Sequence, residues 1–176
     1  MEPLRRTTWG EKGKRPILKC LSRGAKLSVC GALVLNPQQT RLRELILIQE
    51  RNYDTWDMVK ALAELRREVG RDLLVIWDNL SAHRKIARAF QVCRISGIKF
   101  EFLPPYAPEL NPVEGMWSQS KYGQLANFAP ADKHKLKSKV QATLQNQQTD
   151  QGLMRSFFVG AELPLPPANK RRKRCH

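Results

Sequence analysis

The stretch LLVIWDNLSAHRKIARAFQVCRISGIKFEFLPPYAPELNPVEGMWSQSK, residues 73–121, decides the fold of this 176-residue chain. It opens on an apolar run with the length and the β-branched and aromatic content of a fully buried strand. Asp78 follows that run directly, ahead of the turn-forming Asn79. Glu114 comes after a proline-rich loop, in the expected first turn of a helix. Open α/β sheets place their chemistry at such strand ends, so Asp78 and Glu114 are the candidate site residues.

The segments around this stretch predict an α/β order of elements. Residues 27–35 and 42–49 are β-compatible and separated by a turn signal, Asn36-Pro37, which indicates an antiparallel hairpin. Apolar residues at helical spacing then follow Asp54, a candidate N-cap, and stop at Gly70.

After the buried strand, Ser81 is the candidate N-cap of a second helix, and Ile98–Phe102 alternates as a half-buried strand. The predicted order is therefore two strands followed by helix, strand, helix, strand and helix. This is the order of an α/β domain.

The charge balance points to a polyanionic partner. Lys and Arg number 31 against 16 Asp and Glu, which gives a net charge of +15 and a pI near 10.2. The alternative is a basic surface without a dedicated ligand. The four cysteines form no CxxC pair, so neither a zinc site nor a disulfide framework is indicated. We find no membrane span and no signal peptide, and expect a cytoplasmic protein, associated with the nucleoid in a bacterium.

Two carboxylates held at element ends are suited to sharing divalent cations in a site that cuts phosphodiesters. Hard oxygen ligands favour Mg²⁺ or Mn²⁺, and two such ions about 3.5 to 4 Å apart activate the attacking oxygen and stabilise the leaving one. Each carboxylate also has a structural alternative. Asp78 with Asn79 fits an Asx-type turn, and Glu114 fits the third helical position of a capping box that begins at Asn111.

Three neighbours are candidates for orienting the carboxylates or the substrate. Asn79 and Asn111 are placed to act as partners behind the metal ligands. His83, five residues after Asp78, is suited to orienting a water molecule or contacting a phosphate. The alternative for a lone histidine is a satisfied structural residue.

The words WDNLSAH (77–83) and LPPYAPELNPVEGMWSQSK (103–121) closely resemble the DDE superfamily endonuclease domain of IS630 and Tc1/mariner-type transposases. The similarity extends to TTWGEKGKRP (7–16) and QLANFAP (124–130). It implies an RNase H-like mixed sheet flanked by helices, a two-metal site, and DNA transposition by cleavage at transposon ends and joining to target DNA. Asp78 then corresponds to the second acidic member of the family's triad and Glu114 to the third.

The first triad aspartate and the strand that precedes it have no counterpart in the sequence, because Met1 lies eight residues before Trp9. We therefore expect a chain that is inactive alone, either one part of a split transposase or a truncated remnant. Its expected partners are DNA, the upstream transposase part or full-length transposase, and further copies of itself. The alternative function is a non-catalytic, basic DNA-binding remnant that modulates the full-length enzyme.

The expected organisation has four parts. Residues 1–26 form a basic entry segment, residues 27–130 the incomplete catalytic core, residues 131–160 a C-terminal helical segment, and residues 161–176 a proline-rich and then basic, disordered tail. The residues expected to contact DNA are basic side chains in or beside these segments: Arg5, Arg6, Lys12, Lys14, Arg15, Lys121, Lys170, Arg171, Arg172, Lys173 and Arg174.

Overall fold

The computed structural model describes residues 12–13, 27–130, 132–163 and 165–166, and the described chain is a mixed α/β structure. It divides into two compact units. The central unit is Arg51–Asn111, and the hairpin unit is formed by the described residues before and after it. Each is described by itself. Among the described residues, no helix combines the length and the apolar character needed to cross a membrane.

The hairpin unit is built on two antiparallel strands, as expected. Strand β1 (Ser28–Leu35) pairs with β2 (Leu42–Gln49) from Ser28 opposite Gln49 to Leu35 opposite Leu42. The connecting turn is organised by Asn36, whose Oδ1 accepts hydrogen bonds from the backbone N–H groups of Thr40 and Arg41, both at 2.8 Å. This side chain replaces the tight turn that a two-residue hairpin would use.

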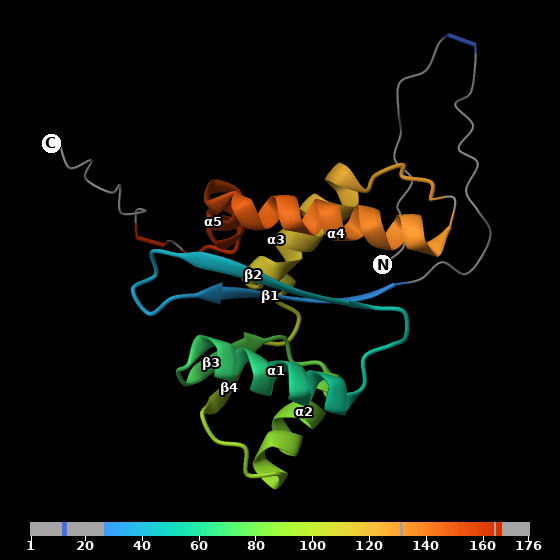
Figure 1. Cartoon of the computed structure of the whole chain (residues 1–176). Coiled ribbons are helices and arrows are strands. Elements are labelled where there is room, and N and C mark those ends of the chain that lie inside the picture. Colours follow the sequence, from blue (N-terminus) through green and yellow to red (C-terminus); the bar gives the residue numbers. More distant parts are fainter. Residues whose placement is uncertain (1–11, 14–26, 131, 164, 167–176) are drawn as a thin grey trace, which may run out of the picture. The chain divides into compact units, whose positions relative to one another are not determined.

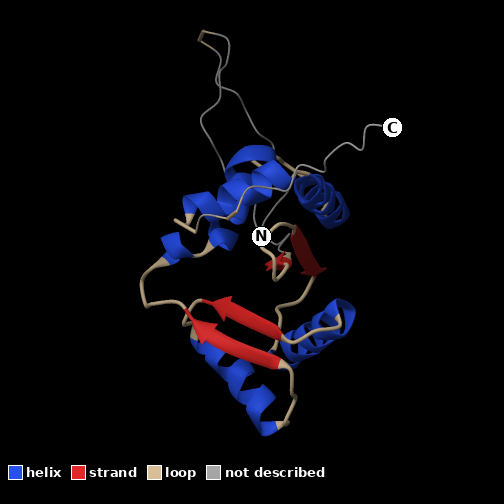
Figure 2. Cartoon of the chain, turned by 90° about the vertical axis from the view of Figure 1, so that its left-hand side faces the viewer, coloured by secondary structure: helices blue, strands red, loops and turns tan. Residues whose placement is uncertain are grey.

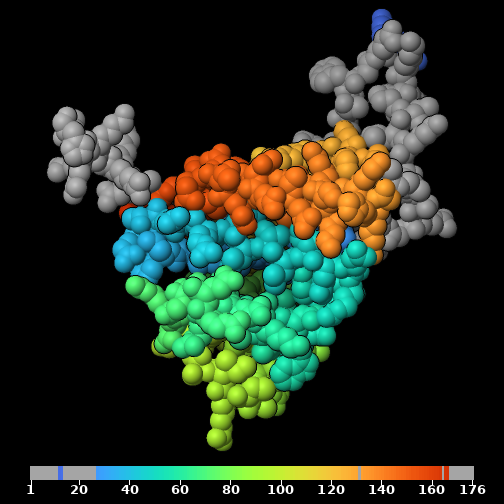
Figure 3. Space-filling model, viewed as in Figure 1, coloured from blue at the N-terminus to red at the C-terminus, as the bar shows by residue number. Residues whose placement is uncertain are grey.

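Helices cover one face of this hairpin (Figure 1). They are α3 (Pro112–Ser118), the π-helix η2 (Gln119–Gln124), α4 (Lys133–Thr149) and α5 (Gln151–Gly160). The buried stripe of α4, with Leu136, Val140 and Leu144, packs on Ile46 and Ile48 of β2. Met154 and Phe158 of α5 pack on Leu42. In the space-filling view, α4 and α5 form an unbroken layer over the strands (Figure 3).

One buried residue of the hairpin is a carboxylic acid. Glu44 lies between Leu42 and Ile46 on the face that the helices cover, and only 4% of it is exposed. Neither carboxyl oxygen has a hydrogen-bond partner among the described residues. Burial without a charged partner raises the pKa of Glu44 to about 7, because desolvation disfavours the ionised form.

The central unit is a parallel strand pair with its helices on one face. Strands β3 (Leu73–Trp77) and β4 (Ile98–Phe102) run parallel, with Leu73 opposite Ile98 and Trp77 opposite Phe102. Helices α1 (Thr55–Val69) and α2 (Ser81–Val92) pack against Val75, Trp77 and Phe100 (Figure 2). A short 3-10 helix, η1 (Pro108–Leu110), ends the unit.

The expectation that Leu73–Trp77 is buried on both faces was wrong. Leu74 and Ile76 point away from the helices and are 59% and 58% exposed. The reason is that both helices of the central unit lie on the other face of the pair. Phe102, at the end of β4, is 38% exposed.

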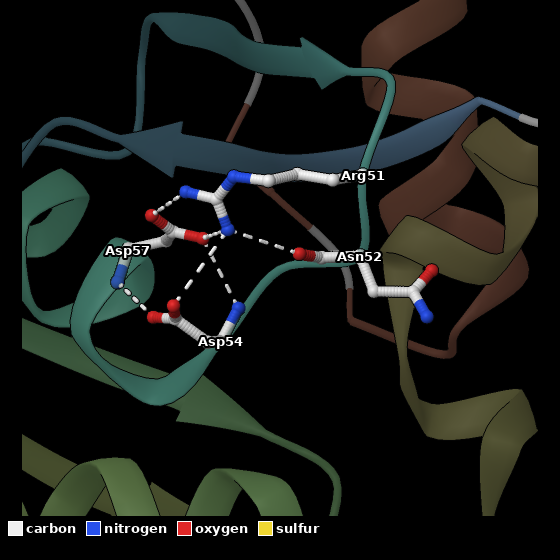
Figure 4. Close-up of polar contacts among 4 residues, drawn as sticks. All are labelled: Arg51, Asn52, Asp54 and Asp57. Carbon is white, nitrogen blue, oxygen red and sulfur yellow. Dashed lines mark hydrogen bonds and ion pairs between the residues drawn. The ribbon is translucent and has the colours of Figure 1, made fainter.

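Helix α1 begins and ends as the sequence predicted. Asp54 is its N-cap and forms a capping box with Asp57, while Gly70 ends it in the left-handed conformation at φ 66°. Arg51 binds both oxygens of Asp57 at 2.6 Å (Figure 4). For α2 the prediction was one residue off: Ser81 is the first helical residue, and the N-cap, Leu80, offers no side-chain hydrogen bond.

We expect Asp54→Ala to lower the free energy of unfolding by about 1 kcal/mol, the usual contribution of an N-cap side chain. The reason is that the Asp57 N–H loses the acceptor that it binds at 2.8 Å. Thermal denaturation followed by circular dichroism measures the change. Asp54→Asn, which keeps an oxygen acceptor, is the matched control, and an equal loss in both variants would contradict the capping role.

Candidate functional site

Asp78 lies at the carboxyl end of β3, where the chain turns into α2. Its Oδ1 accepts the backbone N–H of Leu80 at 3.2 Å, which is the Asx-type turn considered as the structural alternative. The turn positions Leu80, the residue at which α2 begins, which has no side-chain hydrogen bond to the helix. The side chain is 42% exposed, so the turn leaves the carboxylate accessible to solvent and able to bind a ligand.

His83 is held against Asp78 by two kinds of contact. Its Nδ1 lies 2.5 Å from Oδ1 of Asp78 and 3.2 Å from the Asp78 backbone oxygen. A carboxylate oxygen accepts, so Nδ1 is the donor. The imidazole ring stacks on the Trp77 ring, with centroids 4.5 Å apart and planes 3° from parallel. The stacking restrains the His83 ring, and the hydrogen bond from that ring holds the Asp78 carboxylate in place.

Arg84 is a further residue of this edge that the sequence did not single out. Its Nη1 donates to the backbone oxygen and to Oδ1 of Asn79, both at 2.9 Å. Asn79 therefore faces Arg84, and its amide is held from the first turn of α2. The only sequence signal was a basic residue five positions after an asparagine, which is too common a pattern to be selective.

Glu114 belongs to the hairpin unit, in the first turn of α3, and it is exposed. The helix begins at Pro112, as the sequence predicted. The position of α3 on β1 depends on Gly31, because a Cβ atom at residue 31 would come within 2.6 Å of the Met116 Cε and 2.9 Å of the Trp117 ring. The absence of a side chain at Gly31 thus allows α3 to approach the strand closely.

We expect Gly31→Val to destabilise the hairpin unit by about 1 to 3 kcal/mol, the usual cost of overpacking. The added methyl groups would collide with Met116 and Trp117. Chemical denaturation measures the change. Gly160→Ala, where nothing lies within 4 Å of the added carbon, is the control, and equal effects of the two substitutions would contradict the close-approach argument.

The structure brings only part of the predicted site together. Asp78, Asn79 and His83 meet at one edge of the central unit. Asn111 belongs to the same unit and ends η1, donating its backbone N–H to the Pro108 oxygen at 3.0 Å. Glu114 lies in the other unit.

The predicted DNA-contacting residues fall largely outside the described part of the chain. Lys12 lies in an exposed turn, and Lys121 is half-buried in η2. The others lie outside the described residues: Arg5, Arg6, Lys14, Arg15, Lys170, Arg171, Arg172, Lys173 and Arg174. The proposed domain boundaries and these contacts stay predictions.

The donor set fits a hard divalent cation in its chemistry. Asp78 and Glu114 are accessible carboxylates, and oxygen ligands of this kind suit Mg²⁺ or Mn²⁺. Across the described residues, no group of three or more His, Cys, Asp or Glu side chains is arranged to hold a metal ion. Asp78 and Glu114 are therefore candidate ligands that require further ligands to complete a metal site.

Comparison with known protein families identifies the chain. The sequence model described as DDE superfamily endonuclease matches residues 1–137, more than three quarters of the sequence. Searches of curated proteins and of solved structures gave no match. The matched region includes both carboxylates, the strand that ends at Asp78 and the proline-rich loop before α3. The chain belongs to the DDE superfamily endonuclease family.

Proposed function

We propose that this chain is the catalytic part of a transposase of the IS630 or Tc1/mariner type, which cuts and joins DNA strands with divalent cations on an RNase H-like fold. The observation that supports this most is an accessible carboxylate, Asp78, fixed at the carboxyl end of β3 within a region that matches the endonuclease family. Parallel sheets hold their reactive groups at this edge.

Asp78 and Glu114 are the residues that would hold the cations. When bound, Mg²⁺ or Mn²⁺ supplies an activated attacking oxygen and a stabilised leaving oxygen. The resemblance calls for a third acidic ligand, which we assign to no residue of this sequence. The chain alone is therefore proposed to be inactive until another polypeptide contributes that ligand.

The neighbours of Asp78 keep its carboxylate in one orientation. Leu80 and His83 both bind Oδ1, which leaves Oδ2 as the oxygen with no partner among the described residues. His83 is itself restrained by stacking on Trp77. A ligand held in this way loses less conformational entropy when it binds a cation, and outer partners of this kind raise metal affinity.

A cleavage assay tests the proposal. DNA carrying the ends of the mobile element is incubated with the chain alone, with the upstream transposase part alone and with both together, in Mg²⁺, Mn²⁺ or EDTA. We expect strand cleavage that leaves free 3′ hydroxyl groups, requires the metal and appears only in the combined sample. Cleavage that persists in EDTA would contradict a metal-dependent nuclease, and cleavage by the chain alone would contradict its inactivity.

The net charge of +15 favours a second candidate, a non-catalytic DNA-binding protein that modulates full-length transposase. Phosphate contacts would then dominate, and affinity would fall steeply with salt. If Asp78→Asn together with Glu114→Gln leaves every property unchanged while deletion of residues 170–174 abolishes binding, this second function holds. Loss of cleavage in the double variant with intact binding favours the nuclease.

A further inference from the structure

The loop between β4 and α3 presents one aromatic ring entirely to solvent. Tyr106 follows Pro104 and Pro105, precedes Pro108, and is 101% exposed, more than any other large apolar or aromatic residue described. It also adopts a positive φ of 60°. Tyr106 thus combines a fully exposed ring with an uncommon backbone conformation.

Neither property benefits the folded state. A left-handed conformation costs a bulky L-residue roughly 1 to 2 kcal/mol, and an exposed ring forgoes the burial that usually makes tyrosine stabilising. Flanking prolines restrict the loop and lower its entropy before any ligand binds. A conformation that is costly and preorganised, without a contact inside the fold that uses it, indicates an external ligand.

The loop is anchored to the edge of the sheet that carries Asp78. The N–H of Leu103 donates to the backbone oxygen of Trp77 at 2.8 Å, one residue before Asp78. On the other side of Tyr106, the Leu110 N–H donates to the Ala107 oxygen at 3.2 Å within the η1 turn. Because β3 and β4 are parallel, both end at this edge. Tyr106 is three positions after Leu103, a span of at most about 11 Å.

The charge of helix α2 suits a polyanion. Helix α2, which begins here, contains no acidic residue and carries Arg84, Lys85 and Arg88 exposed on its surface. Cations in the first turn of a helix oppose its dipole, so they weaken the helix rather than support it. Proteins that bind single-stranded nucleic acid combine such cations with exposed aromatic rings on which bases stack.

We propose that Tyr106 is a base-stacking residue, whose ring stacks on a nucleobase of DNA whose backbone lies along the start of α2. The proposal rests on the proposed function only in taking DNA as the partner. It adds a contact to a base, next to the contacts to phosphate, and requires neither a metal ion nor Glu114. The phenol oxygen has no part in stacking, so only the ring is needed.

Binding of single-stranded DNA containing 2-aminopurine in EDTA tests this contact. The full chain is compared with Tyr106→Asn, which keeps a residue that tolerates positive φ but removes the ring, and with Tyr106→Phe, which keeps the ring. We expect Asn to weaken binding about 5- to 150-fold and to abolish quenching of 2-aminopurine fluorescence. Phe should bind and quench like the original chain.

The salt dependence and a second tyrosine provide controls. The slope of log affinity against log salt should be the same for Tyr106→Asn and the original chain, because no phosphate contact is removed. Tyr122→Asn, at an exposed tyrosine of η2, should leave quenching unchanged.

Two results would overturn the stacking contact. They are unchanged affinity and quenching in Tyr106→Asn, and the absence of DNA binding by every variant. Loss of metal-dependent cleavage with Tyr106-dependent binding intact would instead overturn the nuclease and leave the stacking contact standing.

Discussion

Asp78→Asn is expected to lower metal-dependent DNA cleavage by at least about 100-fold, because the residues behind a metal ligand alone are worth about 10- to 100-fold. The amide keeps the hydrogen bond to the Leu80 N–H, which is 3.2 Å long in the original chain, but it removes the negative charge that a cation requires. The rate is measured in the preparation that cleaves, with labelled DNA and saturating Mg²⁺.

The control for this substitution is Asp72→Asn. Asp72 is an exposed carboxylate of the same unit, paired with Arg66 at 3.1 Å before β3 begins. Cleavage and DNA affinity should both survive in this variant. Binding of Mn²⁺, followed by electron paramagnetic resonance, should weaken in Asp78→Asn and stay unchanged in Asp72→Asn. Equal cleavage by Asp78→Asn and the original chain would remove Asp78 from the site.

Glu44→Gln is expected to stabilise the protein at pH 8 by about 3 kcal/mol, since one unit of pKa corresponds to about 1.4 kcal/mol. Burial raises the pKa of Glu44 from 4.5 to about 7. Between these values the folded chain keeps a proton that the unfolded chain releases. Stability due to this group therefore falls as pH rises from about 4.5 to 7 and is constant above it. Glutamine is uncharged, like the protonated acid, so the variant does not lose stability as the pH rises.

Denaturant titrations at pH 4.5 and pH 8 measure the effect. The variant and the original chain should unfold at nearly the same concentration at pH 4.5 and differ at pH 8. Glu50→Gln is the control from the end of the same strand, because Lys133 binds that carboxylate at 3.0 Å and lowers the pKa of Glu50. It should give no stabilisation at pH 8. A Glu44→Gln gain of equal size at both pH values would contradict burial of the charge.

The sequence predicted the elements of this chain better than their surroundings. The bounds of β3 and β4 are as expected, because an apolar run followed by turn residues marks β3 and alternation marks β4. The start of α2 was missed by one residue because the backbone oxygen of Leu80 accepts the first helical hydrogen bond, from the Arg84 N–H at 3.1 Å, so that Ser81 is already helical. Exposure of Leu74 and Ile76 depends on which face the helices take, and periodicity within one strand does not specify that.

The same distinction holds for the candidate site. Asp78 was located from its place after an apolar run, but its contact with His83 and the stacking of that ring on Trp77 depend on the angle between β3 and α2. No spacing rule gives that angle. Glu44 was overlooked although the alternation of residues 42–49 places it among inward positions. An acidic residue at an inward position of a predicted strand indicates a buried carboxylic acid.

The close approach at Gly31 has a consequence for the history of the sequence. Residues 31 and 116–117 are far apart along the chain, yet a side chain at the first position would occupy the space of the other two. Their substitutions are therefore coupled. Among related sequences, position 31 should accept a larger residue only where position 116 or 117 has become smaller. A single exchange at either place would displace the helix that carries Glu114, so the pair is expected to evolve by covariation.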